Sequence, residues 1–249
     1  HHHFTKSKEK GLPAVRLYIP EKARVKLMED PPQSTKKWKK AFILDSNRNL
    51  SKIKLRHRGD AARNWAYEKK SWRIKASKKK LFGRVRSYNY GIPKHETLLG
   101  NYIAYNIARR VGVISPRSRM VELFINEEPY GVYNEVEHID ESFLRNNGIM
   151  PVNLYKGEQV YKERYLTIDF DLFNNPSLWR KASIFNRAPE DDFSDLIYLL
   201  KLVREAETSS DAFARLKQLA KMDDWALFSA YQTLLQAWHN DLRHNNRLV

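Results

Sequence analysis

The sequence predicts an α+β protein with a β-rich part over residues 4–139 and a mostly helical part over residues 140–249. Apolar residues alternate with charged ones through the first 80 residues, whereas after residue 190 they recur at every third or fourth position. A period of two is typical of strands with one buried face, and a period near 3.6 of amphipathic helices. The 249 residues are enough for one large domain or two lobes with a substantial core.

The first strands are predicted from apolar residues two positions apart. These pairs are Leu17 and Ile19, Val25 and Leu27, Ile53 and Leu55, and Trp72 and Ile74. Further along, a hairpin is predicted, with one strand over residues 120–126, a turn at residues 126–129, and renewed alternation from Val132 to Val136. We therefore expect antiparallel strands in the first part.

Four helices are predicted. The first covers residues 101–110, where Ile103 and Ile107 share one face and two arginines followed by Gly112 mark the end. The others carry apolar stripes over residues 195–206, 211–220 and 224–238. These three helices make the second part mostly helical.

The charge is concentrated in the first part of the chain. Residues 1–100 hold 27 of the 45 Lys and Arg residues but 8 of the 29 Asp and Glu residues. This excess predicts an anionic partner, although simple solubility explains it equally well. Sequence-specific nucleic-acid binding ranks lower, because Trp38, Trp65 and Trp72 lie among basic residues without a recognition motif.

Composition excludes several kinds of chemistry. The chain has no cysteine, hence no disulfide, no thiol nucleophile and no zinc site of the usual cysteine-bearing kind. The three leading histidines resemble the remnant of a purification tag and are set aside. The mean hydropathy of −0.68 and the lack of a long apolar run predict no membrane-spanning segment. The compartment is left open.

The strongest local motif runs from His239 to Asn246. Its His, Asp, Leu and final Asn stand where protein kinases have His-Arg-Asp-Leu-x-x-x-Asn in the catalytic loop. In such a loop the Asp orients the attacking hydroxyl, and the Asn holds a magnesium ion. Asp241 is therefore a candidate catalytic residue and Asn246 a candidate metal ligand. The alternative is a polar helix end whose side chains cap the last turn.

A basic segment holds the candidate phosphate-binding residues. Arg58 and Gly59 follow a predicted strand, and Gly59 allows a tight turn with close backbone approach to a ligand. On the returning strand, alternation puts Lys70 on the apolar side of Trp72 and Lys75 on the opposite side. We therefore expect Lys70 to point inward, where it needs an anionic partner. The commoner alternative is a lysine that extends to solvent.

Glu135 and Glu137 share one face of the last predicted strand. We expect either of them to pair with Lys70 or Arg73, or to lie beside the entrance to a binding cleft. Ordinary cross-strand pairing with the basic sheet explains them equally well.

Together these segments resemble the CotH family, the spore coat protein H type of atypical protein kinase. The resemblance covers about residues 50–249 and rests on the order and spacing of its segments. These are residues 55–60, 69–75, 98–112, 131–140, 143–144, 153–158 and 241–246.

The resemblance implies a divergent two-lobed protein-kinase-like fold that transfers the γ-phosphoryl group of ATP to protein Ser or Thr, with Mg²⁺ or Mn²⁺. The site residues it implies are Asp241 as catalytic residue, Asn246 as metal ligand, Lys70 or else Lys75 at the phosphates, Arg58 and Gly59 in the phosphate-facing turn, and Glu137 near the adenine. The implied partners are ATP and an acidic or Ser/Thr-bearing protein. The family also suggests a spore-surface or cell-envelope location.

Two departures from the family pattern keep an alternative open: a pseudokinase or scaffold that binds polyanions or acidic surface proteins through the basic first part. Residues 60–62 are Asp-Ala-Ala where the family has Asn-Ser-Ser, so two hydroxyls are lost and a negative charge is added. The family's Trp-Asp-x-Asp segment, whose Asp holds metal, does not occur before Val249. A chain without that Asp is expected to bind Mg·ATP poorly.

Overall fold

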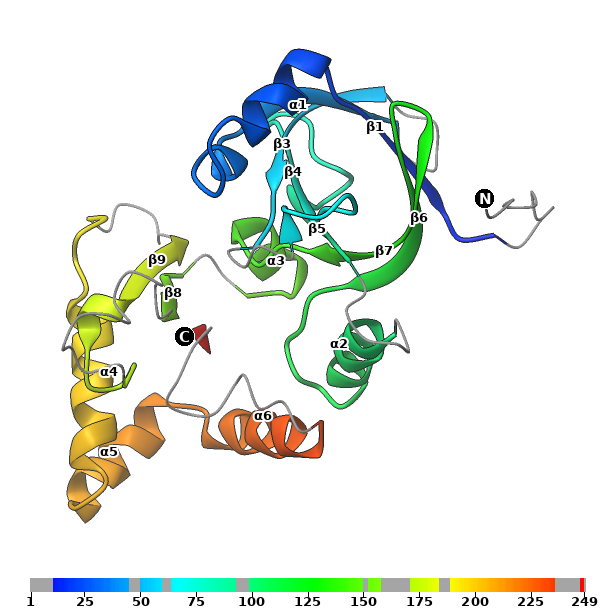
Figure 1. The fold of residues 1–249 in the computed structure, drawn as a ribbon. Helices are drawn as coiled ribbons and strands as arrows, with labels where there is room; N and C mark the ends of the chain where they lie inside the picture. Colours follow the sequence, from blue (N-terminus) through cyan, green and yellow to red (C-terminus); the bar gives the residue numbers. More distant parts are fainter. Residues whose placement is uncertain are drawn as a thin grey trace. The chain divides into compact units, whose positions relative to one another are not determined.

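A computed structural model describes residues 11–44, 50–59, 64–92, 99–149, 152–157, 171–183, 189–235 and 247–248. The chain divides into two compact units, His1–Asn146 and Asn147–Val249 (Figure 1). The division falls after helix α3 (Glu141–Asn146), whereas the periodicity placed it after Ile139. The α+β class is confirmed, since strands dominate the first unit and the longest helices follow in the second.

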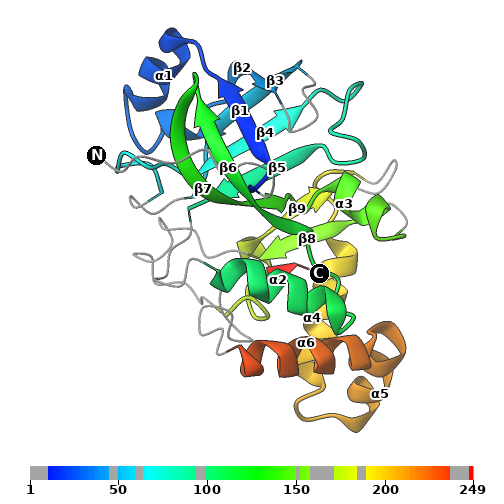
Figure 2. The ribbon, with the colours of Figure 1, turned by 90° about the vertical axis from the view of Figure 1, so that its right-hand side faces the viewer.

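In the described residues of the first unit, seven strands form a closed barrel in the order β1-β2-β3-β4-β5-β7-β6 (Figure 1). The strands are β1 (Ala14–Tyr18), β2 (Lys39–Leu44), β3 (Leu50–His57), β4 (Trp72–Ala76), β5 (Ser87–Gly91), β6 (Ser118–Ile125) and β7 (Glu128–Glu137). Neighbouring strands are antiparallel except β1 and β6, which run parallel and close the wall (Figure 2). This closed form differs from the lobe of a protein kinase that the resemblance implies.

The barrel interior is the main hydrophobic core. Alternate residues of each strand point into it, and Leu17, Leu55, Ile74 and Leu123 are fully buried there. The strands predicted at residues 53–55 and 72–74 are confirmed as β3 and β4. Strands β2 and β5 were not predicted, because β2 mixes lysines with a continuous apolar run and β5 carries tyrosines and polar residues.

The predicted hairpin is confirmed as β6 and β7. Its turn holds Asn126 and Glu127, whose φ angles of 51° and 69° suit a tight two-residue turn between Ile125 and Glu128. The Asn126 side chain accepts a hydrogen bond from Ile19 N at 2.8 Å and donates one to Ile19 O at 2.9 Å. The hairpin tip is thereby fixed to the end of β1.

The strand predicted at Val25 and Leu27 is wrong, because these residues lie in helix α1 (Glu21–Met28). Leu27 is fully buried while Val25 is 55% exposed, so the two residues do not share a face as they would in a strand. Residues two apart in a helix are separated by roughly 200° around its axis. A single pair with this spacing does not distinguish the two structures.

The predicted helix at residues 101–110 is confirmed as α2 (Gly100–Arg110). It ends as expected, with Arg109 and Arg110 in the last turn and Gly112 at a φ of 90°. Helix α2 lies outside the barrel and contacts β6 (Figure 1). One short 3₁₀ helix, Ser34–Lys36, precedes β2.

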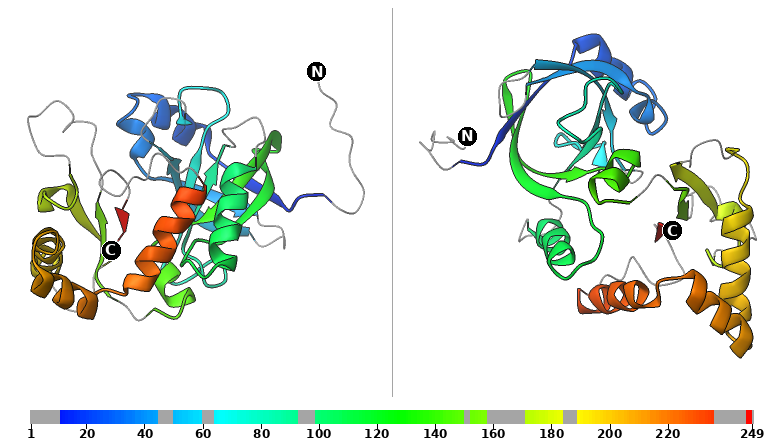
Figure 3. Two further views of the ribbon diagram at one scale, coloured as in Figure 1. Left: turned by 90° about the horizontal axis from the view of Figure 1, so that it is seen from below. Right: turned by 180° about the vertical axis from the view of Figure 1, so that it is seen from behind.

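The second unit combines a small sheet with three helices in its described residues. The sheet has the order β10-β8-β9, with β8 (Leu154–Gly157), β9 (Trp179–Ser183) and β10 (Arg247–Leu248). The helices are α4 (Ser194–Glu205), α5 (Ser210–Leu219) and α6 (Met222–Leu234). The apolar stripes predicted all three, although α6 ends at Leu234 and not at residue 238. Helices α4 and α5 pack against each other (Figure 3).

A second core lies between this sheet and helix α4. Its buried residues are Tyr155, Leu172, Leu178, Trp179, Leu196 and Leu200. Trp179 follows a 3₁₀ turn (Pro176–Leu178), and its indole nitrogen donates to Leu172 O at 2.7 Å. No helix in the described residues is long and apolar enough to cross a bilayer.

Candidate functional site

The outer surface of β2, β3 and β4 is strongly basic. In β3, Ile53 and Leu55 point into the barrel and the residues between and beside them point outward. These three strands, all of them described, contain no Asp or Glu. The outward-facing cations are called the basic wall below. They are Lys40, Lys52, Lys54, Arg56, Arg73 and Lys75.

The strand register places like charges directly opposite each other in the basic wall. Lys54 of β3 lies opposite Lys40 of β2 on one side and Lys75 of β4 on the other. Arg56 lies opposite Arg73 in the next outward-facing row. Opposed like charges on neighbouring strands destabilise a sheet. An anion bound on the wall would relieve this repulsion.

Lys75 has several positively charged neighbours in and beside the wall. Its pKa is lowered, first by partial burial and then by the positive charges of Arg86, Lys54 and Lys78, while Asp140 opposes the shift. The Lys75 Nζ is 5.8 Å from the ring centre of Trp38. Half-buried cations that repel one another bind a compact anion favourably.

Lys70 does not point into the barrel. Strand β4 begins at Trp72, and Ser71 and Trp72 are both buried, so the alternation does not extend back to Lys70. The Lys70 Nζ instead donates to Tyr67 O at 2.6 Å. The inward orientation predicted for Lys70 is therefore wrong, whereas Lys75 faces outward as the alternation predicted.

Lys69, next to it, is held by β7. Its Nζ donates to Val132 O at 3.0 Å and lies 4.9 Å from the ring centre of Tyr133. Partial burial lowers the pKa of Lys69. Lys69 therefore links the segment before β4 to strand β7.

The turn at Arg58 and Gly59 depends on glycine. Gly59 has a φ of 93°, and a Cβ placed there would lie 2.4 Å from the Asn64 side-chain nitrogen. Ser71 bonds to the residues on either side of the segment that follows Gly59: its carbonyl accepts from Arg58 N at 2.9 Å, and its own N donates to Asn64 O at 2.8 Å. The positive φ of Gly59 agrees with the glycine-dependent conformation predicted there, whereas residues 60–63, with the altered residues 60–62 among them, lie outside the described residues.

His57 and Trp72 form a buried pair at the start of this turn. They are opposite each other in β3 and β4, with ring centres 4.2 Å apart. Burial, followed by the positive charge of Lys70, lowers the pKa of His57 to about 4. His57 is therefore neutral near neutral pH.

Glu135 pairs neither with Lys70 nor with Arg73. It is buried, and its carboxylate accepts from Arg119 Nε at 2.5 Å and from the Tyr90 hydroxyl at 2.9 Å. Arg73 instead donates to the Asn89 side chain at 2.7 Å. The predicted pairing with the basic strand is wrong for Glu135, because this residue points to the inner side of β7, whereas Arg73 is on the outer side of β4.

Glu137 is also buried, at 1% exposure, and only one of its two carboxylate oxygens has a hydrogen-bond partner among the described residues. Its Oε1 accepts from the Asn146 side chain at 3.0 Å, and its buried Oε2 has no hydrogen-bond partner among the described residues. Its backbone N donates to Arg117 O at 2.9 Å. The carboxylate is therefore held at the end of β7, where the chain leaves the barrel wall.

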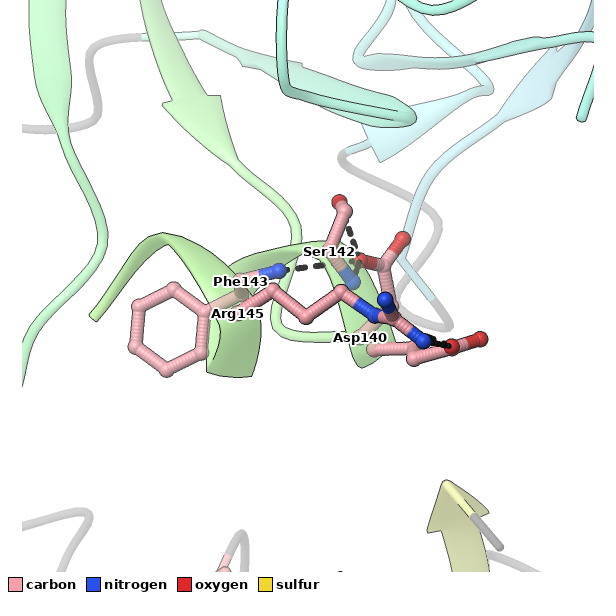
Figure 4. A network of polar contacts seen from close by, with 5 residues as sticks. Asp140, Ser142, Phe143 and Arg145 are labelled. Atoms are coloured by element: carbon pink, nitrogen blue, oxygen red, sulfur yellow. Dashed lines mark hydrogen bonds and ion pairs between the residues drawn. The ribbon is translucent and has the colours of Figure 1, made fainter. Parts of the chain in front are cut away.

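Asp140 orders the segment after β7 (Figure 4). Its Oδ1 accepts from Ser142 N at 2.9 Å, from the Ser142 hydroxyl at 2.6 Å and from Phe143 N at 3.3 Å, which caps α3. The Ser142 hydroxyl oxygen in turn accepts from Arg86 N at 3.1 Å. This network connects the segment after β7 to the start of β5, next to Lys75.

Asp241 and Asn246 lie outside the described residues, as do His239 and His244. Their roles stay predictions. Within the described ranges, no three His, Asp or Glu side chains gather as they would around a metal ion.

Sequence reasoning missed several residues of the basic wall and its surroundings. Alternating cations in residues 52–56 were a usable signal, since period two places Lys52, Lys54 and Arg56 on one face. Nothing in the sequence indicated Arg86 or Asp140 as neighbours of Lys75, because both come from distant segments.

Comparison with known proteins identifies the family of the chain. The family model described as "CotH kinase protein" matches residues 55–249. The inner spore coat protein H of Bacillus subtilis (strain 168) is 23% identical over 172 residues, which cover 68% of this chain and 47% of that protein. The chain thus spans about half the length of this curated relative. Because the family model matches well over half of the chain, from β3 to its last residue, the protein belongs to the CotH family.

Proposed function

We propose that this protein is an ATP-dependent kinase of the CotH type, which transfers the γ-phosphoryl group to protein Ser or Thr. The proposal includes a divergent two-lobed protein-kinase-like arrangement of the whole protein. The observation that carries it, beside family membership, is the mutually repelling cluster of Lys75, Arg86 and Lys54 on the outer wall of the barrel. Phosphoryl transfer needs cations at the phosphates more than covalent chemistry from the protein.

Lys75 is assigned to the phosphates in preference to Lys70. The segment Trp72-Arg73-Ile74-Lys75 matches the Ile and Lys of the Val-Ala-Ile-Lys strand in protein kinases, whose lysine holds the α- and β-phosphates. Lys70 lies before the strand and already bonds to Tyr67 O. In typical kinases a glutamate of the next helix pairs with this lysine, but α2 contains no Asp or Glu. Lys75 therefore depends on other charges, and Asp140 is the carboxylate that stabilises its charge.

The remaining residues keep the roles that the family implies. Arg58 and Gly59 form the phosphate-facing turn, and Glu137 lies near the adenine. Asp241 positions the substrate hydroxyl, and Asn246 holds the metal. The basic wall suits ATP, since its closely spaced cations match the charge of a triphosphate. Mg²⁺ or Mn²⁺ would supply further charge neutralisation at the phosphates.

Transfer of a radiolabelled γ-phosphoryl group to an acidic Ser-bearing protein tests the proposal. Asp241→Ala is expected to abolish transfer while the protein stays folded, because the substrate hydroxyl loses the group that positions it. Asp223→Ala, at an exposed position of α6, is the matched control and is expected to keep full activity. Unchanged transfer by the Asp241 variant would overturn the assignment.

A second candidate function is a scaffold without phosphoryl transfer, and the six cations of the basic wall favour it as well. The two functions respond to different conditions. Binding of a polyanion weakens steeply with salt, whereas binding of ATP depends on the divalent metal. A wild-type protein that shows no thermal stabilisation at millimolar Mg·ATP, yet binds polyanions, would favour the scaffold.

A further inference from the structure

We propose that the β2 and β3 side of the basic wall is a docking surface for an acidic, extended segment of a partner protein. This surface consists of Lys40 and Phe42 of β2 and Lys52 and Lys54 of β3. The proposal does not depend on phosphoryl transfer, because Lys40, Phe42 and Lys52 are not assigned to the nucleotide and only Lys54 is shared with the cationic cluster around Lys75.

Within the described ranges, no carboxylate forms an ion pair with the lysines of this surface. Lys40, Lys52 and Lys54 are all exposed. Lys40 and Lys54 are directly opposite each other, an arrangement that costs stability in the free protein. Carboxylates bound across the two strands would form ion pairs with these lysines and offset their repulsion.

The surface also has an apolar centre. Phe42 is 38% exposed and lies directly opposite Lys52, on the same side of β2 as Lys40. Side chains on one face of a strand repeat at about 6.7 Å, which is also the repeat of alternate side chains in an extended peptide. A partner segment in which acidic residues alternate around an apolar one therefore fits both features.

The nucleotide does not account for this surface. Lys40 lies two strands away from Lys75, about 10 Å across the sheet. A compact triphosphate centred on Lys75 and Arg86 therefore leaves the β2 side of the wall unoccupied.

A nucleic acid fits the surface less well than an acidic peptide. Single strands bind by stacking successive bases on open aromatic faces. The ring of Trp38 is already approached by two cations, with the Arg56 guanidinium 5.2 Å and the Lys75 Nζ 5.8 Å from its centre. Phe42 offers one ring on which a base could stack, whereas a single strand needs several in succession.

Fluorescence polarisation with a labelled poly-glutamate peptide tests the proposal on the whole chain. The double variant Lys52→Gln/Lys54→Gln is expected to weaken binding about tenfold, since each exposed charge contributes modestly. The matched control Lys22→Gln/Lys26→Gln removes the same charge from exposed positions on α1 and is expected to bind as the wild type does. Asp241→Ala is expected to bind the peptide normally, which separates this surface from the kinase function.

Three results would overturn the proposal. They are absence of peptide binding, an equal loss in both lysine double variants, and tighter binding of a single-stranded oligonucleotide than of poly-glutamate at equal salt. The second result would mean attraction by net charge alone, and the third would assign the surface to nucleic acid. Phe42→Ser is expected to weaken binding of a peptide with an apolar residue among its glutamates more than that of poly-glutamate.

Discussion

Strands β3 and β4 have two faces with opposite chemistry. Their inner faces carry Ile53, Leu55, Trp72 and Ile74, all nearly inaccessible to solvent. Their outer faces carry cations that oppose one another in register. The inner face explains why the strands form and stay paired, since burial of apolar area drives folding. The outer face contributes repulsion to the free protein, so its composition points to binding rather than to stability.

The largest expected effect comes from the inner face. Leu55→Ala removes a fully buried side chain from the barrel core and is expected to destabilise the protein by about 4 kcal/mol. Urea unfolding followed by circular dichroism measures the change. A loss below about 1 kcal/mol would mean that the barrel is not closed around Leu55.

The second effect is the pH dependence that His57 imposes. Its pKa is about 4 in the folded protein and 6.5 in an ordinary histidine, so the unfolded chain takes up the proton first. Stability is therefore expected to fall as the pH drops from about 6.5 to about 4, by at most about 3 kcal/mol from this residue. His57→Phe keeps an aromatic ring beside Trp72 and removes the titration. The free energy of unfolding is measured at several pH values for both proteins. If it fell with pH as steeply in this variant as in the wild type, His57 would not be the cause.

The third effect concerns Gly59, which follows the end of β3. Gly59→Ala places a methyl group against Asn64 at a φ of 93° and is expected to cost about 2 kcal/mol. Thermal unfolding measures this cost. Gly83→Ala is the matched control, because its φ of 59° is also positive but open space surrounds it. Equal losses in the two variants would mean that backbone strain, and not the contact with Asn64, makes glycine necessary.

The smallest effect has the opposite sign. Lys54→Gln relieves the repulsion from Lys40 and Lys75 and is expected to stabilise the free protein by a few tenths of a kcal/mol, about 0.3. The gain should shrink as salt is added, because exposed charges are screened. A destabilised Lys54→Gln protein would contradict the view that the outer face is selected for binding.

Much of the fold was predictable from periodicity. Long regular patterns, such as those of α4 to α6 and of β6 and β7, were predicted correctly because several residues agree on one period. The pair Val25 and Leu27 misled because two apolar residues are too few to establish a period. Barrel closure was not predictable, since it depends on β1 pairing with both β2 and β6, contacts between residues far apart in the sequence.

The candidate site was predictable only in part. Alternation identified the outward face of Lys75, but applying it to Lys70 failed because the strand begins two residues later, at Trp72. The partners of Glu135 were hidden for a different reason. Arg119 and Tyr90 meet it through the pairing of β7 with β6 and β5, which no local pattern encodes.

The most direct test of the central claim is the affinity for Mg·ATP, measured by calorimetry in wild type, Lys75→Ala and Lys70→Ala. If the outer face around Lys75 holds the phosphates, Lys75→Ala weakens binding at least about tenfold, whereas Lys70→Ala changes it by less than about twofold. Wild-type affinity in the Lys75 variant, or a larger loss in the Lys70 variant, would contradict the account.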